Sequence, residues 1–185
     1  MTDKAQMLDA ALTIIAKEGY ANFSLSKLAM RTGTPLADLY QMFTGRSGLL
    51  TALSERLDEE LKAAVEPSDE GTARDRIFDV VMTRLELLAP YKAMFVVMAH
   101  ELPQVPQDAV IVLRSMIEVC GTMLELAGVD ISGLKGRMRV QSLIAIYARV
   151  LKAWVRDDDP GLAPTMALLD RWLRRTEQVT PNFWS

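Results

Sequence analysis

Residues 24–43, with the sequence SLSKLAMRTGTPLADLYQMF, decide the fold of this chain. Ser24 is a typical N-cap residue, because its hydroxyl accepts a hydrogen bond from the free N–H groups of a helix's first turn. Gly33 follows the small Ala29 by four positions and supplies the positive φ of a tight turn. Leu39, six positions further on, plugs the core between two short helices. This spacing is typical of a helix-turn-helix motif.

Helical periodicity extends outward from this motif over nearly the whole chain, and no long segment alternates apolar and polar residues as a half-buried strand does. We therefore predict an all-α fold of about nine helices. Thr34 is expected to cap the third helix, with Pro35 at its first position, and Ser47 to begin the fourth. The expected helices cover 3–18, 25–32, 35–43, 47–64, 73–88, 91–101, 107–127, 135–156 and 162–176.

The breaks between these helices predict the domain organisation. Residues 1–46 form a head, 47–66 a connecting helix, and 67–178 a helical body, with a linker at residues 67–71. Residues 179–185 are expected to form a loose tail. The alternative is that Phe183 and Trp184 dock against the body.

Composition limits the class of protein. The chain has 185 residues, of which 50% are apolar and 24% charged, which is an ordinary balance for a globular protein with a buried core. Its uncharged apolar stretches are much shorter than the roughly 20 residues that cross a bilayer. The N-terminus lacks the basic and apolar segments of a secretory signal. We therefore expect a cytoplasmic protein without a membrane span.

Recognisable motifs of catalysis and of metal or phosphate binding are absent from the sequence. We predict no enzymatic activity, no metal site and no cofactor. Cys120 and His100 are the single residues of their types. Cys120 is expected to be a buried, inert thiol, and the acidic run at residues 157–159 a solvated turn rather than a calcium loop.

The N-terminal fifty residues resemble the TetR family of regulators. The similarity is carried by AAL at 10–12, AKEGY at 16–20, SL at 24–25, LA at 28–29, LYQMF at 39–43 and LL at 49–50. Members of that family are dimeric transcriptional repressors with a three-helix DNA-binding head and a helical body that takes a small ligand. The resemblance implies an operator in double-stranded DNA, a homodimer and a small-molecule effector.

The resemblance also implies which residues contact the base edges or the phosphates of DNA. These are Ser24, Lys27, Thr34, Pro35, Leu36, Ala37, Asp38, Tyr40, Gln41 and Arg46. Two departures stand out: Leu36 occupies a position where the family often has lysine, and the third helix contains no lysine or arginine. Residues 1–50 carry five basic and four acidic side chains, a formal charge of +1. We expect weak, salt-sensitive DNA binding, partly restored by dimerisation.

The body is similar to the C-terminal region of lipid-binding ubiquinone-biosynthesis proteins. That similarity is carried by FDVVMTRLELLAPY at 78–91, by Ile146, Tyr147 and Trp154, and by residues 165–174. It implies an alternative function, that of a non-enzymatic accessory protein in quinone biosynthesis that has lost DNA binding. We expect the chain to lack the C-terminal amphipathic membrane helix of those proteins.

The body is rich in methionine, which fills irregular gaps and tolerates varied ligands. We predict an apolar, lipid-like effector, although an ordinary core also explains these side chains. The candidate lining residues are Met94, Phe95, Met98, Met116 and Tyr147.

The last two long helices carry broad apolar stripes. By resemblance to the TetR family they form a four-helix bundle with a second subunit, and packing within one subunit is the alternative. The candidate interface residues are Val140, Ile144, Tyr147, Leu151, Trp154, Leu169, Trp172 and Leu173. The sequence thus favours a ligand-responsive transcriptional regulator, and we expect it to act as a repressor.

Overall fold

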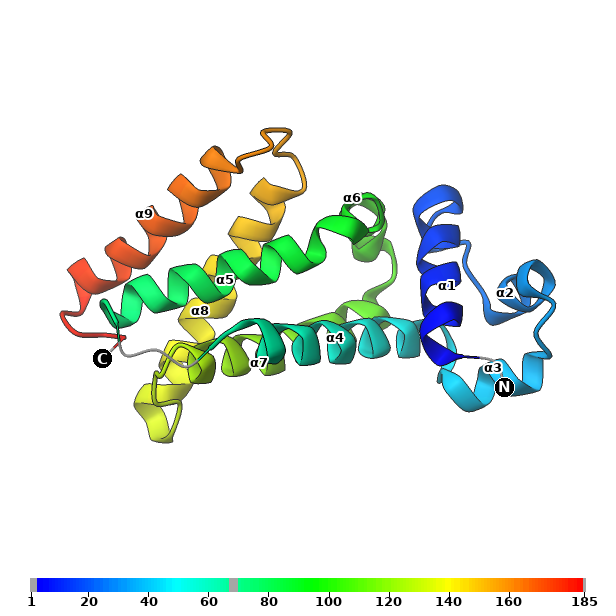
Figure 1. Ribbon diagram of the computed structural model, residues 1–185, viewed down its shortest axis with the longest axis horizontal. Coiled ribbons are helices and arrows are strands. Elements are labelled where there is room, and N and C mark those ends of the chain that lie inside the picture. Colours follow the sequence, from blue (N-terminus) through cyan, green and yellow to red (C-terminus); the bar gives the residue numbers. More distant parts are fainter. Residues whose placement is uncertain (1–2, 67–69, 185) are drawn as a thin grey trace. The chain divides into compact units, whose positions relative to one another are not determined.

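The computed structural model describes residues 3–66 and 70–184, and within these ranges the chain is all-helical without strands (Figure 1). The predicted fold class is confirmed. The helices are α1 (Lys4–Glu18), α2 (Leu25–Thr32), α3 (Leu36–Met42), α4 (Gly45–Ala64), α5 (Ala73–Leu88), α6 (Lys92–Glu101), α7 (Pro106–Leu126), α8 (Gly133–Trp154) and α9 (Ala163–Val179). Short 3-10 turns at Ala89–Tyr91 and Leu102–Gln104 flank α6.

The chain divides into two compact units. The first contains Met1–Arg56 and Pro90–Ser115, and the second contains Leu57–Ala89 and Met116–Ser185. Helices α4 and α7 each run from one unit into the other. The division at residues 46 and 66 expected from the sequence stays a prediction, and residues 67–69 of the expected linker lie outside the described residues.

Local signals build the helix-turn-helix as predicted. The Ser24 hydroxyl oxygen accepts a hydrogen bond from the backbone N–H of Lys27 at 3.2 Å, which caps α2. Gly33 ends α2 in the left-handed region, with φ of 71°. Leu39 of α3 is fully buried, and α2 and α3 pack together.

The predicted cap of α3 is wrong. Pro35 takes the N-cap position with ψ of 135°, so the helix begins at Leu36. Thr34 therefore lies too early in the chain to cap it, and the Thr34 hydroxyl donates instead to the sulfur of Met7 at 3.4 Å. Likewise, α4 begins at Gly45, two residues before the predicted Ser47.

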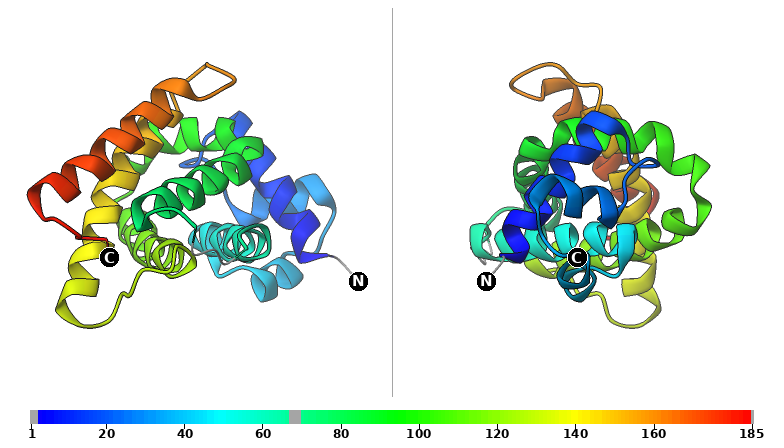
Figure 2. Two further views of the ribbon diagram at one scale, coloured as in Figure 1. Left: turned by 60° about the vertical axis from the view of Figure 1, so that its left-hand side comes forward. Right: turned by 90° about the vertical axis from the view of Figure 1, so that its right-hand side faces the viewer.

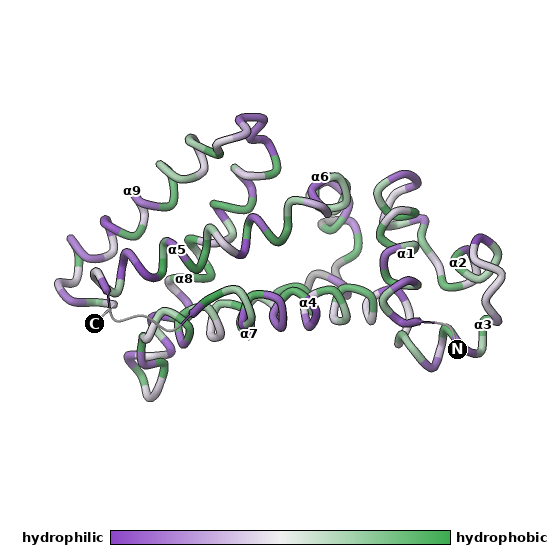
Figure 3. Tube along the Cα trace, in the orientation of Figure 1, coloured by the Kyte–Doolittle hydropathy of each residue, from purple (hydrophilic) through white to green (hydrophobic). Residues whose placement is uncertain are grey.

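The second unit is built on α5, α8 and α9, which pack against one another (Figures 1 and 2). Hydropathy alternates along these helices, as expected for helices that bury one face (Figure 3). Their fully buried core residues include Ile77, Val81, Leu85, Leu143, Val150, Leu169 and Leu173.

The C-terminal segment is docked, so the expectation of a loose tail is wrong. Phe183 is 6% exposed and Trp184 fully buried, and their rings meet edge to face with centroids 4.8 Å apart. The Arg139 guanidinium on α8 donates to the carbonyl oxygen of Phe183 at 2.7 Å. The two aromatic side chains therefore complete the core of the second unit.

The acidic turn before α9 is only partly solvated. Asp157 is buried, and its carboxylate accepts hydrogen bonds from the backbone N–H and the hydroxyl of Thr165, at 3.1 and 2.5 Å. Asp158 and Asp159 are exposed. The predicted solvated turn is therefore wrong for Asp157, which satisfies the first turn of α9 as an N-terminal capping group does.

Gly136 lies directly against the backbone of Ile131. It is a buried residue of α8, and a Cβ built on it would lie 1.9 Å from the carbonyl carbon of Ile131. Gly121 on α7 is also buried, but a Cβ there would meet only a side-chain methyl group of Ile131, at 3.8 Å.

We predict opposite effects for alanine at these two glycines. Gly136→Ala should lower the free energy of unfolding by about 1–3 kcal/mol, because backbone must move to admit the methyl group. Gly121→Ala should leave it unchanged or raise it by up to about 1 kcal/mol, because alanine is the better helix former. Urea denaturation of the two variants checks this, and equal midpoints would contradict the close approach.

Candidate nucleic-acid interface and effector region

The exposed face of α3 is made of four side chains. Leu36 is 37% exposed and Tyr40 59%, and Ala37 and Gln41 are also exposed. Leu39 and Phe43 lie buried on the opposite side and fix the helix to the head. The second helix of a helix-turn-helix is the one that enters the major groove, so this face is the candidate surface for base contacts.

The remaining predicted DNA contacts have mixed positions. Pro35 and Ser24 are exposed, Lys27 and Asp38 are half-buried, and Thr34 is buried. The hydroxyl of Ser24 is committed to capping α2. These roles stay predictions, and the burial of Thr34 leaves little of that residue for DNA to contact.

Two cations on α2 share one acidic partner at the end of α1. The ammonium of Lys27 lies 3.6 Å from the carboxylate of Glu18, and Arg31 forms an ion pair with the same carboxylate. Pairs as exposed as these contribute about 0–1 kcal/mol. Phosphate groups can therefore compete for Lys27 and Arg31 at little cost.

Arg46 makes more contacts than Lys27 or Arg31, and its acidic partner is buried. Two of its guanidinium nitrogens donate to the same carboxylate oxygen of Asp108, at 2.7 and 3.0 Å. The third donates to the carbonyl oxygens of Tyr20 and Ala21, at 3.4 and 3.1 Å. The guanidinium also lies over the Tyr20 ring, 4.6 Å from its centroid.

Tyr20 completes this cluster. Its hydroxyl donates to the Asp108 carboxylate at 3.0 Å, and the whole residue is buried. Burial raises the pKa of Tyr20 well above its ordinary value of 10, and the hydrogen bond to Asp108 adds to the shift. The phenol therefore remains a proton donor to Asp108. The phosphate role predicted for Arg46 stays a prediction, and it requires the guanidinium to leave this buried carboxylate.

A second acidic side chain holds the loop after α1. The carboxylate of Glu101, at the end of α6, accepts a hydrogen bond from the backbone N–H of Ala21 at 2.7 Å. Gly19 leaves room for this contact, since a Cβ there would lie 2.7 Å from the Glu101 carboxylate. Helices α1 and α6 pack together within the first unit. Residues 19–21 are thus tied to both α6 and the start of α7.

The predicted effector residues belong to different units. Met94 and Met98 are buried and Phe95 half-buried on α6, in the first unit. Met116 on α7 is half-buried and Tyr147 on α8 is buried, in the second unit. Their role in binding an effector stays a prediction.

Tyr147 belongs to a buried polar cluster that sequence reasoning missed. On α5, the Arg84 guanidinium lies 2.6 Å from the carboxylate of Asp58, and only 3% of the Arg84 side chain is exposed. Burial raises the pKa of Asp58 and of Tyr147, and the charge of Arg84 opposes both shifts. Nε of Arg84 has no hydrogen-bond partner among the described residues.

The positive charge of Arg84 acts on Cys120 and opposes the rise of its pKa. The thiol is fully buried, and burial raises its pKa to about 12. This confirms that Cys120 is buried, as predicted from its place in an apolar helical stretch.

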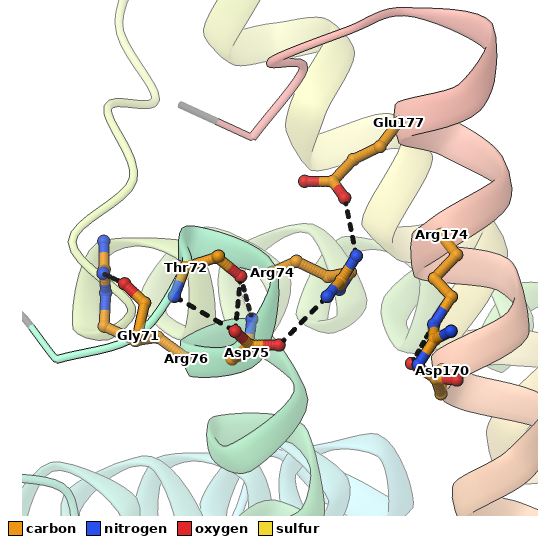
Figure 4. A network of polar contacts seen from close by, with 8 residues as sticks. All are labelled: Gly71, Thr72, Arg74, Asp75, Arg76, Asp170, Arg174 and Glu177. Atoms are coloured by element: carbon orange, nitrogen blue, oxygen red, sulfur yellow. Dashed lines mark hydrogen bonds and ion pairs between the residues drawn. The ribbon is translucent and has the colours of Figure 1, made fainter.

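An open pocket of about 400 Å³ lies between α5 and α9. Phe78, Met166 and Ala167 supply its apolar wall, and Arg74, Asp75, Asp79 and Asp170 its charged rim. Arg74 bridges Asp75 and Glu177, at 3.3 and 3.1 Å (Figure 4). Hydrogen bonds from Thr72 hold the pKa of Asp75 below its ordinary value. No pattern in the sequence predicts this pocket, because the pocket depends on which helices pack together.

The predicted dimer residues fall into two groups. Tyr147, Trp154, Leu169 and Leu173 are buried within the second unit, whereas Val140, Ile144, Leu151 and Trp172 keep part of their surface. The guanidinium groups of Arg149 and Arg175 lie over the Trp172 ring, 5.0 and 5.5 Å from its centroid. The interface stays a prediction, and only the second group has surface for a partner to cover.

Neither a metal-ion cluster nor a membrane-spanning helix occurs in the described part of the chain. No cluster of three or more histidine, cysteine or acidic side chains is arranged there to hold a metal ion. None of the helices in that part combines the length and apolarity that crossing a bilayer requires.

Comparison with known proteins points to one class. Residues 7–53 match the sequence model described as bacterial regulatory proteins, tetR family. The fatty acid metabolism regulator protein of Bacillus subtilis strain 168 is 24% identical over 168 residues, which span 83% of this chain and 84% of that protein.

Solved structures share the fold over the whole length. A TetR transcriptional regulator from Nitrosomonas europaea aligns with a TM-score of 0.73 and 19% identity, over 95% of this chain and 98% of that one. The regulator FadR from Bacillus subtilis, solved in complex with stearoyl-CoA, aligns with a TM-score of 0.58 and 23% identity, over 93% and 96% of the two chains.

We predict that the Asp108 carboxylate stabilises the first unit through Arg46. Asp108→Asn should lower the free energy of unfolding by about 3 kcal/mol, because it leaves a largely buried guanidinium without its counter-charge. Tyr20→Phe, the matched control, removes one hydrogen bond but keeps the ion pair, and should cost about 1.5 kcal/mol. Urea denaturation at neutral pH measures both. A larger loss for Tyr20→Phe than for Asp108→Asn would contradict this order.

Proposed function

We propose that this chain, whose residues 7–53 match the tetR family of bacterial regulatory proteins, is a repressor that binds a pseudopalindromic operator as a homodimer and releases it on binding an effector. The observation that carries the proposal is the helix-turn-helix of α2 and α3, which lies inside the family match at residues 7–53. Its relatives are regulators rather than enzymes, and we propose no catalytic step.

Dimerisation compensates for a weakly charged head. A two-fold dimer presents two copies of α3 to major-groove faces one helical turn apart, which doubles the contacts. In each head we propose that Lys27 and Arg31 contact phosphates, since their shared partner Glu18 holds them through exposed ion pairs. The Tyr40 hydroxyl, on an exposed side chain, is a further donor.

The proposed effector is an apolar acyl compound with a polar or anionic end. Support comes from two relatives, one named for fatty acid metabolism and the other solved with stearoyl-CoA. In this chain, the second unit combines a large apolar core with a buried guanidinium, Arg84, whose Nε has no hydrogen-bond partner among the described residues. An apolar core that contains a buried guanidinium with a donor left over suits such an amphiphile.

Helices α4 and α7 are the proposed route from effector to operator. Each begins in the first unit and continues into the second. The start of α4 carries Arg46 and the start of α7 carries Asp108, and these two side chains pair beside Tyr20 of the head. A shift of either helix in the body would therefore act on the head through this ion pair.

We predict that the purified protein enriches a palindrome from a random duplex pool. Fluorescence anisotropy with the enriched duplex should then show affinity falling steeply between about 50 and 200 mM salt, because bound cations release counterions from the DNA. Lys27→Ala should flatten this slope by about one unit per head. Lys17→Ala, an exposed lysine outside the motif, serves as the matched control and should leave the slope unchanged.

Absence of any enriched sequence would overturn the proposed function. Extraction of a bound lipid from such a protein would instead favour the accessory role in quinone biosynthesis that the resemblance of the body implies.

We predict that stearoyl-CoA lowers operator affinity at least tenfold, whereas free CoA does not, because the acyl chain supplies the apolar contact. Arg84→Lys keeps a positive charge in the core but lacks the planar donors of arginine, and should weaken this response. Arg137→Lys, on an exposed residue of α8, is the control. Anisotropy titrations at fixed salt measure all three proteins, and equal responses would contradict a role for Arg84.

A further inference from the structure

We infer that α3 reads A·T base pairs, through thymine methyl groups and an adenine edge, and does not read guanine. This inference rests on the proposed function and adds the base class of the operator. It is carried by the chemistry of the four exposed side chains of α3 and by the positions of the cations in the head.

The exposed side chains of α3 form two neighbouring rows. Leu36 and Tyr40 are four residues apart, as are Ala37 and Gln41, so each pair shares one strip of the helix surface. Leu36 and Ala37 lie in the first turn, and the N-terminal residues of a recognition helix are those that reach base edges. The leading part of the face is therefore apolar.

Each base presents a different edge in the major groove. Thymine offers a methyl group, which favours apolar partners such as Leu36 and Ala37. Adenine offers an acceptor and a donor side by side, which match the amide of Gln41. Guanine offers two acceptors, which arginine or lysine binds with two hydrogen bonds, and α3 contains neither residue.

The cations that flank α3 are engaged elsewhere in the head. Arg31, before the turn, pairs with Glu18 on α1, and Arg46, after α3, pairs with Asp108 on α7. Arg31 belongs to α2, the helix that crosses the DNA backbone in this motif, so its natural partner is a phosphate. Arg46 would have to abandon a carboxylate that is 8% exposed to reach a base.

Asp38 is the acidic residue of α3, and it is half-buried in the first turn of the helix. A carboxylate there interacts favourably with the helix dipole, which accounts for it without a base contact. An aspartate is also able to accept a hydrogen bond from cytosine, which would place a G·C pair in the half-site. The experiment separates these two roles.

Modified duplexes test the inference one atom group at a time. In the enriched operator, each thymine is replaced in turn by deoxyuridine, which lacks only the methyl group, and each adenine by 7-deazaadenine, which lacks the N7 acceptor. At one or more positions of each half-site, deoxyuridine should weaken binding about fourfold, the effect of one buried methyl group. At an adjacent adenine, the 7-deaza base should weaken it about tenfold.

Matched variants assign these losses to residues. Leu36→Ala should bind the thymine and deoxyuridine duplexes with nearly equal affinity, and Gln41→Ala should no longer distinguish adenine from its 7-deaza form. Met30→Ala removes an apolar side chain that is 78% exposed on α2, outside the proposed face, and should retain both sensitivities. All three side chains are exposed, so circular dichroism should show unchanged helical content and melting.

Two outcomes would overturn the inference while leaving the proposed function intact. One is an enriched palindrome that binds equally with thymine or deoxyuridine at every position. The other is a half-site whose affinity depends on 7-deazaguanine substitution, or on a cytosine that Asp38→Asn no longer distinguishes. A protein that enriches no sequence contradicts the proposed function, and the inference with it.

Discussion

The contact on which the first unit most depends is the ion pair between Arg46 and Asp108. It joins residues 62 positions apart, at 2.7 Å, and it is enclosed by the ring and hydroxyl of Tyr20. The pair has little exposure to solvent, so its members cannot separate without cost. The three short helices of the head are thereby attached to α7 through a charge, while apolar side chains such as Leu39 and Phe43 hold the head together from within.

Features set by local sequence were predictable, and those set by distant contacts were not. Ser24 and Gly33 act on their own helix, so their cap and turn could be read from the sequence and were found as predicted. The partner of Arg46, the docking of Trp184 and the burial of Asp157 all depend on which segments meet in the folded chain. The cap predicted at Thr34 was wrong for a local reason. Pro35 itself takes the N-cap position, so the helix begins at Leu36.

The two units place their charged side chains differently. In the head, Lys27, Arg31 and Arg46 pair with carboxylates. The exposed face of α3 carries only neutral side chains. In the second unit, Arg84 and Asp58 lie in the core, where a polar pair is costly and demands a reason. A head of low charge, for which we propose contacts with thymine methyl groups, and a body that buries Arg84 in its core fit a regulator of modest operator affinity.

The burial of Cys120 has a practical consequence. A thiol that is fully enclosed and has a pKa of about 12 forms almost no thiolate at neutral pH. Because the sequence contains a single cysteine, the native protein should not react with thiol-directed probes. A cysteine introduced on an exposed helix would carry a fluorophore or spin label alone, so that distances between labelled subunits can be followed on DNA and with effector.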